Sequence, residues 1–164
     1  MNKITSTLCA MALTILPQTG AAQEVTFGVG YADFTSSDGD NSAFLDLEYR
    51  FRPFKERPVL SLSWGAAANL TENGDLFVGA GLWGRWQLKN QWFVDLSVMP
   101  GLFEEGTDGN DLGLAFEVRS LAGLGYRFDS GSAISLAVSH KSNAGLGDSN
   151  PGANALLLRY HRSF

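Results

Sequence analysis

The chain has 164 residues and a formal net charge of −5, and no stretch of it gathers basic residues. These features argue against nucleic acid as a partner, because phosphate binding needs a clustered positive surface. The mean hydropathy is −0.03 and no apolar run of about 20 residues follows residue 22, which excludes a helical membrane protein.

Residues 1–22 are typical of a secretory signal peptide: a basic start at Lys3, an apolar run from Leu8 to Leu16, and small residues up to Ala22. The run is too short to span a bilayer as a helix. We expect cleavage after Ala22 and one mature domain, residues 23–164. The only cysteine, Cys9, lies in this leader, so a thiol, a disulfide and a cysteine-based metal site are not expected in the mature chain.

Polar and apolar residues alternate with a period of two through almost the whole mature sequence, which predicts strands. Turn residues separate them, including a proposed turn from Pro53 to Pro58. We expect eight strands, near residues 24–34, 43–52, 59–70, 76–88, 91–103, 114–128, 132–142 and 154–164.

Alternation alone fits either a soluble sandwich or a membrane barrel, which differ in whether the apolar face is turned inward or outward. The expected export signal favours a barrel. So does the end of the chain, where Leu156, Leu158, Tyr160 and the final Phe164 resemble the C-terminal signature of bacterial outer-membrane barrels. We therefore expect an all-β fold, an eight-stranded antiparallel outer-membrane β-barrel, located in the bacterial outer membrane.

The interior of an eight-stranded barrel has room for side chains only, so it is not a pore. The charged residues of the strands should fill it as paired ions, since unpaired buried charges are costly. The residues expected to point inward are Asp46, Glu48, Arg50, Arg52, Arg85, Asp95, Glu117, Arg119, Arg159 and His161.

The seventh expected strand departs from this polarity, because His140 and Ser142 continue the outward apolar face of Ile134, Leu136 and Val138. Side chains two residues apart on a strand are separated by about 6.6 Å. An imidazole can then reach the hydroxyl as a general base, as a serine nucleophile requires. The alternative is an interfacial polar pair at the end of a strand. The sequence contains no metal-ligand spacing.

The stretch from His140 through Ser142 to Gly145, followed by Asn150-Pro151-Gly152, resembles the active-site signature of the lipid A 3-O-deacylase (PagL) family. That family is an eight-stranded outer-membrane barrel with a Ser-His-Glu triad on its outer wall. The resemblance implies a serine esterase that needs no cofactor and deacylates lipid A, the membrane anchor of lipopolysaccharide. It assigns His140 as base, Ser142 as nucleophile and Asn143 to the oxyanion hole, where the nearby Gly145 could supply a second N–H.

One position departs from the family pattern: Asn154 stands where the family has its glutamate. Its side-chain carbonyl could orient His140 but carries no full charge, and Asp148 in the preceding loop is an alternative. The departure leaves open a slow enzyme, an altered substrate, or a non-catalytic structural or surface-binding barrel. The sequence also leaves open whether the chain is a monomer or a homodimer.

Overall fold

The computed structural model describes residues 23–32, 42–107 and 111–164, and the expected signal peptide lies outside these ranges. Within them no helix is long and apolar enough to cross a membrane. The strands are β1 (Glu24–Ala32), β2 (Ser42–Arg57), β3 (Leu60–Thr71), β4 (Leu76–Gln87), β5 (Trp92–Glu104), β6 (Phe116–Arg127), β7 (Ser132–Ser142) and β8 (Ala153–Ser163).

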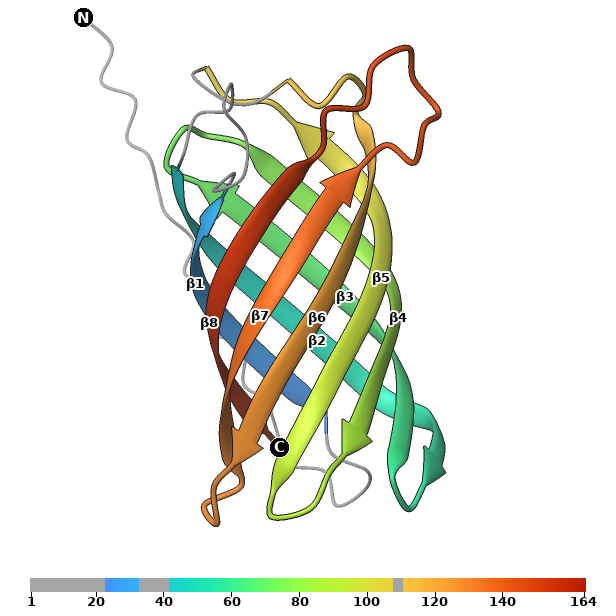
Figure 1. The fold of residues 1–164 in the computed structure, drawn as a ribbon, viewed down its shortest axis with the longest axis vertical. Coiled ribbons are helices and arrows are strands. Elements are labelled where there is room, and N and C mark those ends of the chain that lie inside the picture. Colours follow the sequence, from blue (N-terminus) through green and yellow to red (C-terminus); the bar gives the residue numbers. More distant parts are fainter. Residues whose placement is uncertain (1–22, 33–41, 108–110) are drawn as a thin grey trace, which may run out of the picture.

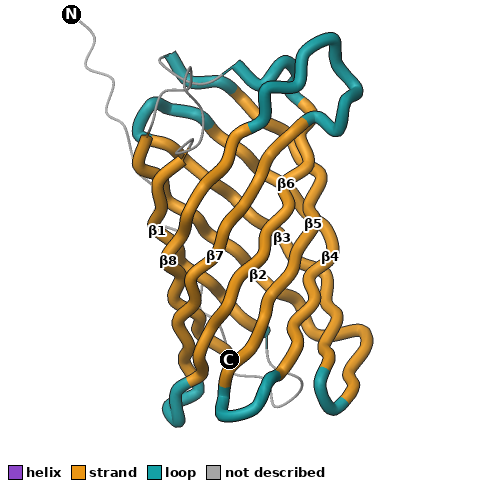
Figure 2. Tube along the Cα trace, in the orientation of Figure 1, coloured by secondary structure: helices purple, strands orange, loops and turns teal. Residues whose placement is uncertain are grey.

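The eight strands form a closed barrel in chain order (Figure 1). Each strand pairs antiparallel with the next, and β1 pairs with β8 from Glu24↔Ser163 to Ala32↔Ala155. Closure gives every strand two neighbours and leaves no sheet edge, which lipid could not solvate. The C-terminus lies at one end of the barrel, the terminal end, and the β7–β8 connection lies at the opposite loop end (Figure 2).

The expected all-β barrel is confirmed, and β3 to β8 begin and end within two residues of the expected limits. The proposed turn from Pro53 to Pro58 is wrong, because β2 continues to Arg57 and only Pro58 and Val59 turn. Register shifts on both sides of Pro53 accommodate a residue that cannot donate to the ladder. The shift also breaks the alternation, so Arg52 is exposed and not inside the barrel as expected.

Apolar side chains cover the outside of the barrel. Phe27, Leu47, Leu136 and Leu158 are 56%, 48%, 57% and 57% exposed, as the alternation predicts. Their neighbours along each strand are buried and largely polar, such as Glu48 and Arg159. Apolar outside and polar inside is the arrangement of a membrane barrel, and it is the reverse of a soluble sandwich.

Ion pairs fill the lumen. Towards the terminal end, Arg85 contacts both oxygens of Glu24 at 2.7 and 2.8 Å and both oxygens of Asp95 at 2.6 and 2.8 Å. Further along, Arg119 bridges Asp46 at 3.1 Å and Glu48 at 2.6 Å. Paired in this way, buried charges are tolerated and link strands far apart in the sequence. The lumen is therefore packed, and the chemistry of the protein has to be sought elsewhere.

Candidate active site

The outer wall near the loop end carries the predicted site. Strand alternation puts His140 on the outer face of β7 in line with Leu136 and Val138, and it is exposed. The register brings Asn154 of β8 directly beside it on one side. Ser120 of β6 lies beside it on the other. Three strands thus contribute one row of polar side chains to a wall that is otherwise apolar.

His140 and Asn154 are hydrogen-bonded, with 2.9 Å between Nδ1 of the ring and Oδ1 of the amide. Because an amide oxygen can only accept, Nδ1 carries the proton, and in the neutral ring the lone pair is then on Nε2. A neutral imidazole held in this tautomer is what a general base requires. Asp148, the alternative partner, is exposed in the loop, and Asn154 already occupies the nitrogen it would have contacted.

Gly152 forms a support beneath the imidazole. Its φ of +69° lies in the left-handed region, which favours glycine. A Cβ there would lie 2.8 Å from Cε1 and 3.4 Å from Nε2 of His140. Any side chain would therefore push the ring off its place beside Asn154. This contact gives a physical reason for the glycine in the Asn150-Pro151-Gly152 turn.

Ser142 is the last residue of β7, on the same face as His140 and half-buried. Among the described residues, no hydrogen bond joins its hydroxyl to the imidazole. Two residues of strand separate the side chains by about 6.6 Å. Base and nucleophile are thus neighbours that can meet by side-chain rotation, and catalytic hydrogen bonds often tighten only in the substrate complex.

Asn143 is fully buried and organises the β7–β8 loop. Its Nδ2 donates to the carbonyls of Leu112 at 3.2 Å and Ser149 at 2.6 Å. Its backbone N–H donates to Oδ1 of Asn150 at 3.0 Å, and its own Oδ1 accepts the N–H of Gly145 at 3.0 Å. In this conformation the donors of Asn143 and Gly145 are therefore used within the loop and not offered to an oxyanion.

Ala144, the residue between Asn143 and Gly145, takes no part in these contacts. Ala144 is exposed with a left-handed φ of +57°, and its N–H has no partner in the part of the chain that the structure describes. A non-glycine residue in this conformation is uncommon and often marks a functional turn. The sequence placed Ala144 and Gly152 within the motif but did not assign them these roles, which depend on backbone conformation and on contacts in space. Ser120 lies outside the motif and was not predicted.

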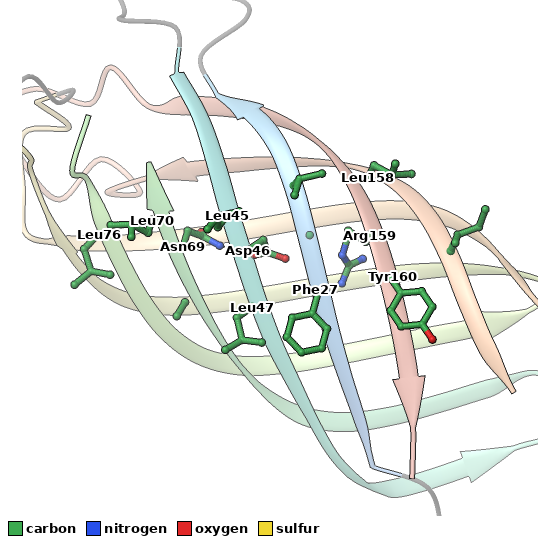
Figure 3. Close-up of a pocket in the computed structure, with 14 residues that line it drawn as sticks. Phe27, Leu45, Asp46, Leu47, Asn69, Leu70, Leu76, Leu158, Arg159 and Tyr160 are labelled. Carbon is green, nitrogen blue, oxygen red and sulfur yellow. Dashed lines mark hydrogen bonds between the residues drawn. The ribbon is translucent and has the colours of Figure 1, made fainter. Parts of the chain in front are cut away.

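A hollow of about 670 Å³ lies on the outer wall over β1, β2, β3 and β8, and Leu76 of β4 and Ile134 of β7 also line it (Figure 3). It is lined mainly by apolar side chains such as Phe27, Leu47 and Tyr160. Its polar neighbours are engaged in the lumen: Asp46 with Arg119, and Arg159 with Glu48. Among the described residues no His or Ser lines it, so His140 stays the candidate base. In the described ranges no three His, Cys, Asp or Glu side chains form a metal-binding group.

The comparisons with known proteins bear on the family and on the fold. The family model for lipid A 3-O-deacylase (PagL) matches residues 43–163, which include the whole β7–β8 hairpin. No curated protein sequence matches the chain.

Among solved structures, the barrel is similar to the outer membrane enzyme PagL at a TM-score of 0.67 and 20% identity, covering 84% of this chain and 97% of that one. It is also similar to a de novo designed transmembrane β-barrel, with a TM-score of 0.59, 13% identity, and coverage of 91% and 100%. Neisserial surface protein A gives a TM-score of 0.56 at 12% identity, with coverage of 87% and 97%. These likenesses support the fold, and the match of the family model over most of the sequence shows the family. The chain belongs to the lipid A 3-O-deacylase (PagL) family.

Proposed function

We propose that this protein is an outer-membrane serine esterase that removes the 3-O-linked acyl chain of lipid A. The observation that carries the proposal is the bond between His140 Nδ1 and Asn154 Oδ1, which leaves a basic Nε2 on the outer wall near Ser142. The family description names the same substrate and bond. An apolar wall with a single polar row near one end suits a substrate that lies in the membrane.

The proposed reaction has two halves. Ser142 Oγ attacks the ester carbonyl carbon while its proton passes to Nε2 of His140, and the ester C–O bond breaks as that proton moves to the leaving sugar oxygen. Water then attacks the acyl-enzyme, giving one proton to His140, which returns it to Ser142 as the fatty acid departs. Asn154 keeps Nδ1 protonated throughout, as a positioning residue.

The oxyanion of each tetrahedral intermediate needs preorganised donors, which often make the largest contribution to catalysis. We propose the loop directly after Ser142 for this role. The N–H of Ala144 is available. The N–H of Asn143 would join it if its bond to Oδ1 of Asn150 opened on substrate binding, and that of Gly145 if its bond to Oδ1 of Asn143 opened. Asn143 then has two roles: its side chain fixes the shape of the loop, and its hydrogen bonds keep backbone N–H donors occupied until the substrate binds.

The orientation of the barrel follows from the expected export. With the terminal end in the periplasm, the loop end and His140 lie at the level of the outer leaflet, where lipopolysaccharide is found. The substrate then reaches the site from the side, through the lipid, and does not pass through the packed lumen.

Mass spectrometry of lipid A tests the function directly. Lipid A is extracted from cells that carry wild-type protein, Ser142→Ala protein or an empty vector. Only the wild type should yield lipid A lighter by one acyl chain, with both proteins present in the membrane at equal levels. Identical spectra for wild type and Ser142→Ala would instead favour a non-catalytic barrel. That alternative stays open because Asn154 stands where the family has a glutamate.

A further inference from the structure

The exposed charges of the barrel are divided between its two ends. The terminal end carries the turns β2–β3, β4–β5 and β6–β7 (Figure 1). The exposed basic side chains of the described residues all lie at this end: Arg52, Lys55, Arg57, Lys89 and Arg162. At the loop end, the exposed charged side chains in the same ranges are all acidic: Glu72, Glu104, Glu105, Asp111 and Asp148.

Two of the cations stand at the edge of the apolar outer wall. Lys55 pairs with Leu62 and Arg57 with Leu60 across the β2–β3 ladder, and directly paired residues share a face of the sheet. That face is the outer one, because Leu60 pairs in turn with the exposed Trp86 of β4. A long basic side chain in this position can lay its methylene stem on apolar neighbours and extend its charge beyond them.

Two further cations continue this edge around the barrel. Arg162 follows Tyr160 by two residues on the outer face of β8 and pairs with Val25 of β1. Lys89 is exposed in the turn that joins β4 to β5. The cations are therefore spread over the outer rim of the terminal end and do not form one compact patch.

Aromatic rings border the same rim. The rings of Phe54 and Trp64 lie 5.8 Å apart between centroids, and those of Trp92 and Tyr126 lie 5.5 Å apart. Belts of aromatic residues mark the level at which the apolar wall of a barrel meets the membrane–water interface. The cations therefore lie at the level of the lipid headgroups.

The protein itself supplies these cations with little negative charge. In the described ranges, Lys55, Arg57, Lys89 and Arg162 form no ion pair with a carboxylate. Two exposed acids lie at the same end, but Glu56 pairs with Ser61 on the opposite face of the hairpin from Lys55 and Arg57. Asp129 accepts a hydrogen bond of 2.8 Å from Nε2 of Gln91. An anion from outside the chain can therefore approach the four cations.

We infer that these four cations, named here the basic collar (Lys55, Arg57, Lys89 and Arg162), bind the phosphate groups of anionic phospholipids in the leaflet at the terminal end. A phospholipid beside the barrel brings its phosphate to the level of the collar and its acyl chains to the apolar wall next to it. In the orientation proposed above, this leaflet faces the periplasm. The inference depends on the membrane barrel and not on the esterase reaction.

Native mass spectrometry of the purified protein in detergent tests the collar. The protein is mixed with equal amounts of phosphatidylglycerol and phosphatidylcholine that have the same acyl chains, so only the headgroup charge differs. Wild type should retain more phosphatidylglycerol. A neutral variant with Lys55→Gln, Arg57→Gln, Lys89→Gln and Arg162→Gln should lower the ratio of bound phosphatidylglycerol to phosphatidylcholine by at least about tenfold, since one cation near an anionic surface contributes about fivefold.

Two control variants separate the collar from other causes. Exchange of the basic residue types, Lys55→Arg, Arg57→Lys, Lys89→Arg and Arg162→Lys, keeps every charge and should keep the ratio. Glu104→Gln with Glu105→Gln changes the net charge at the loop end only and should also leave the ratio unchanged. Heat-modifiable mobility in electrophoresis verifies that each variant is folded.

Three results would overturn the inference: no preference for phosphatidylglycerol in wild type, the same preference in the neutral variant, or a rise in the loop-end variant as large as the fall in the neutral one. The last result would mean that the lipid responds to net charge alone. Lipid binding is measured without turnover, so a failure of the proposed esterase does not affect this test.

Discussion

The two histidines of the mature chain lie on neighbouring strands and on opposite sides of one barrel wall. His161 of β8 points into the lumen and is 1% exposed. Its Nδ1 lies 3.0 Å from Oε1 of Glu24 and its Nε2 lies 2.8 Å from Oγ of Ser135. His140 of β7 points outward, and in the part of the chain that the structure describes its ring is hydrogen-bonded to Asn154 alone, through Nδ1.

This difference shows that the environment of an imidazole decides what it can do. With both nitrogens engaged and Phe93 packed edge-on against the ring at 5.5 Å, His161 has no lone pair for a substrate. His140 has Nδ1 bonded to Asn154, and among the described residues no hydrogen bond reaches its Nε2. Under the proposed function, the inner face of the barrel would serve stability and the outer face reactivity.

Replacing His140 should have the largest effect on activity. His140→Ala removes the proposed base, and the rate of lipid A deacylation should fall by about 10⁴-fold, as in other serine hydrolases that lose a triad member. The free energy of unfolding should change by less than about 0.5 kcal/mol, since the side chain is exposed. Deacylation of purified lipid A in micelles and urea unfolding measure the two quantities. Normal deacylation would remove His140 from the mechanism.

Replacing His161 should have the opposite effects: a loss of stability and an unchanged rate of deacylation. His161→Ala leaves a cavity and removes one of the partners of Glu24, which should lower the free energy of unfolding by about 2–4 kcal/mol. The folded fraction should retain its deacylation rate, because the lumen does not meet the substrate. Urea titration followed by heat-modifiable mobility gives the stability. A folded His161→Ala protein without activity would contradict the separation of tasks by face.

Gly152→Ala should displace the outer imidazole without removing it. The new Cβ would lie 2.8 Å from Cε1 of His140, and activity should fall by at least about tenfold, as for other small misplacements of a catalytic group. Gly131→Ala is the matched control, because Gly131 also has a left-handed φ, +82°, yet open space around its missing side chain. Both variants should lose about 1–2 kcal/mol of stability from backbone strain. Equal deacylation rates for the two would show that the support beneath His140 is unimportant.

Substitutions of Asn154 should have the smallest effects on activity, and they test how Asn154 acts as the hydrogen-bond partner of His140. Asn154→Ala removes a neutral hydrogen bond and should slow deacylation by about 2–10-fold. Asn154→Glu supplies a carboxylate, whose charge-assisted bond is about twice as strong, and should accelerate it. The acceleration requires that the longer side chain fit beside His140. Three equal rates for wild type, Asn154→Ala and Asn154→Glu would mean that another group orients the base.

Much of the fold could be predicted because alternation reports directly which face of a strand meets lipid. The error at β2 has a physical origin: Pro53 reads as a strand breaker, but a bulge in the ladder at the end of the barrel accommodates it. The register shift between Arg50 and Pro53 interrupts the alternation of inward and outward side chains, and Arg52, which lies within it, is exposed.

The candidate site was predictable where it depends on strand register. His140 and Asn154 meet because β7 and β8 form a hairpin, and pairing across a hairpin can be counted from its turn. The contacts of Asn143 could not be counted in this way. Its acceptors are the backbone carbonyls of Leu112 and Ser149, whose positions depend on the shapes of two loops.

The outward direction of His140 has a consequence for the kinetics of the proposed enzyme. A site on the wall of a barrel meets its substrate by lateral diffusion in two dimensions. The concentration that governs its rate is then the mole fraction of the lipid in the leaflet, and not an amount per volume of water. The membrane then acts as the solvent of the reaction. A change in the leaflet that lowers the mole fraction or the lateral diffusion of the substrate should therefore lower the rate, as a substitution in the site does.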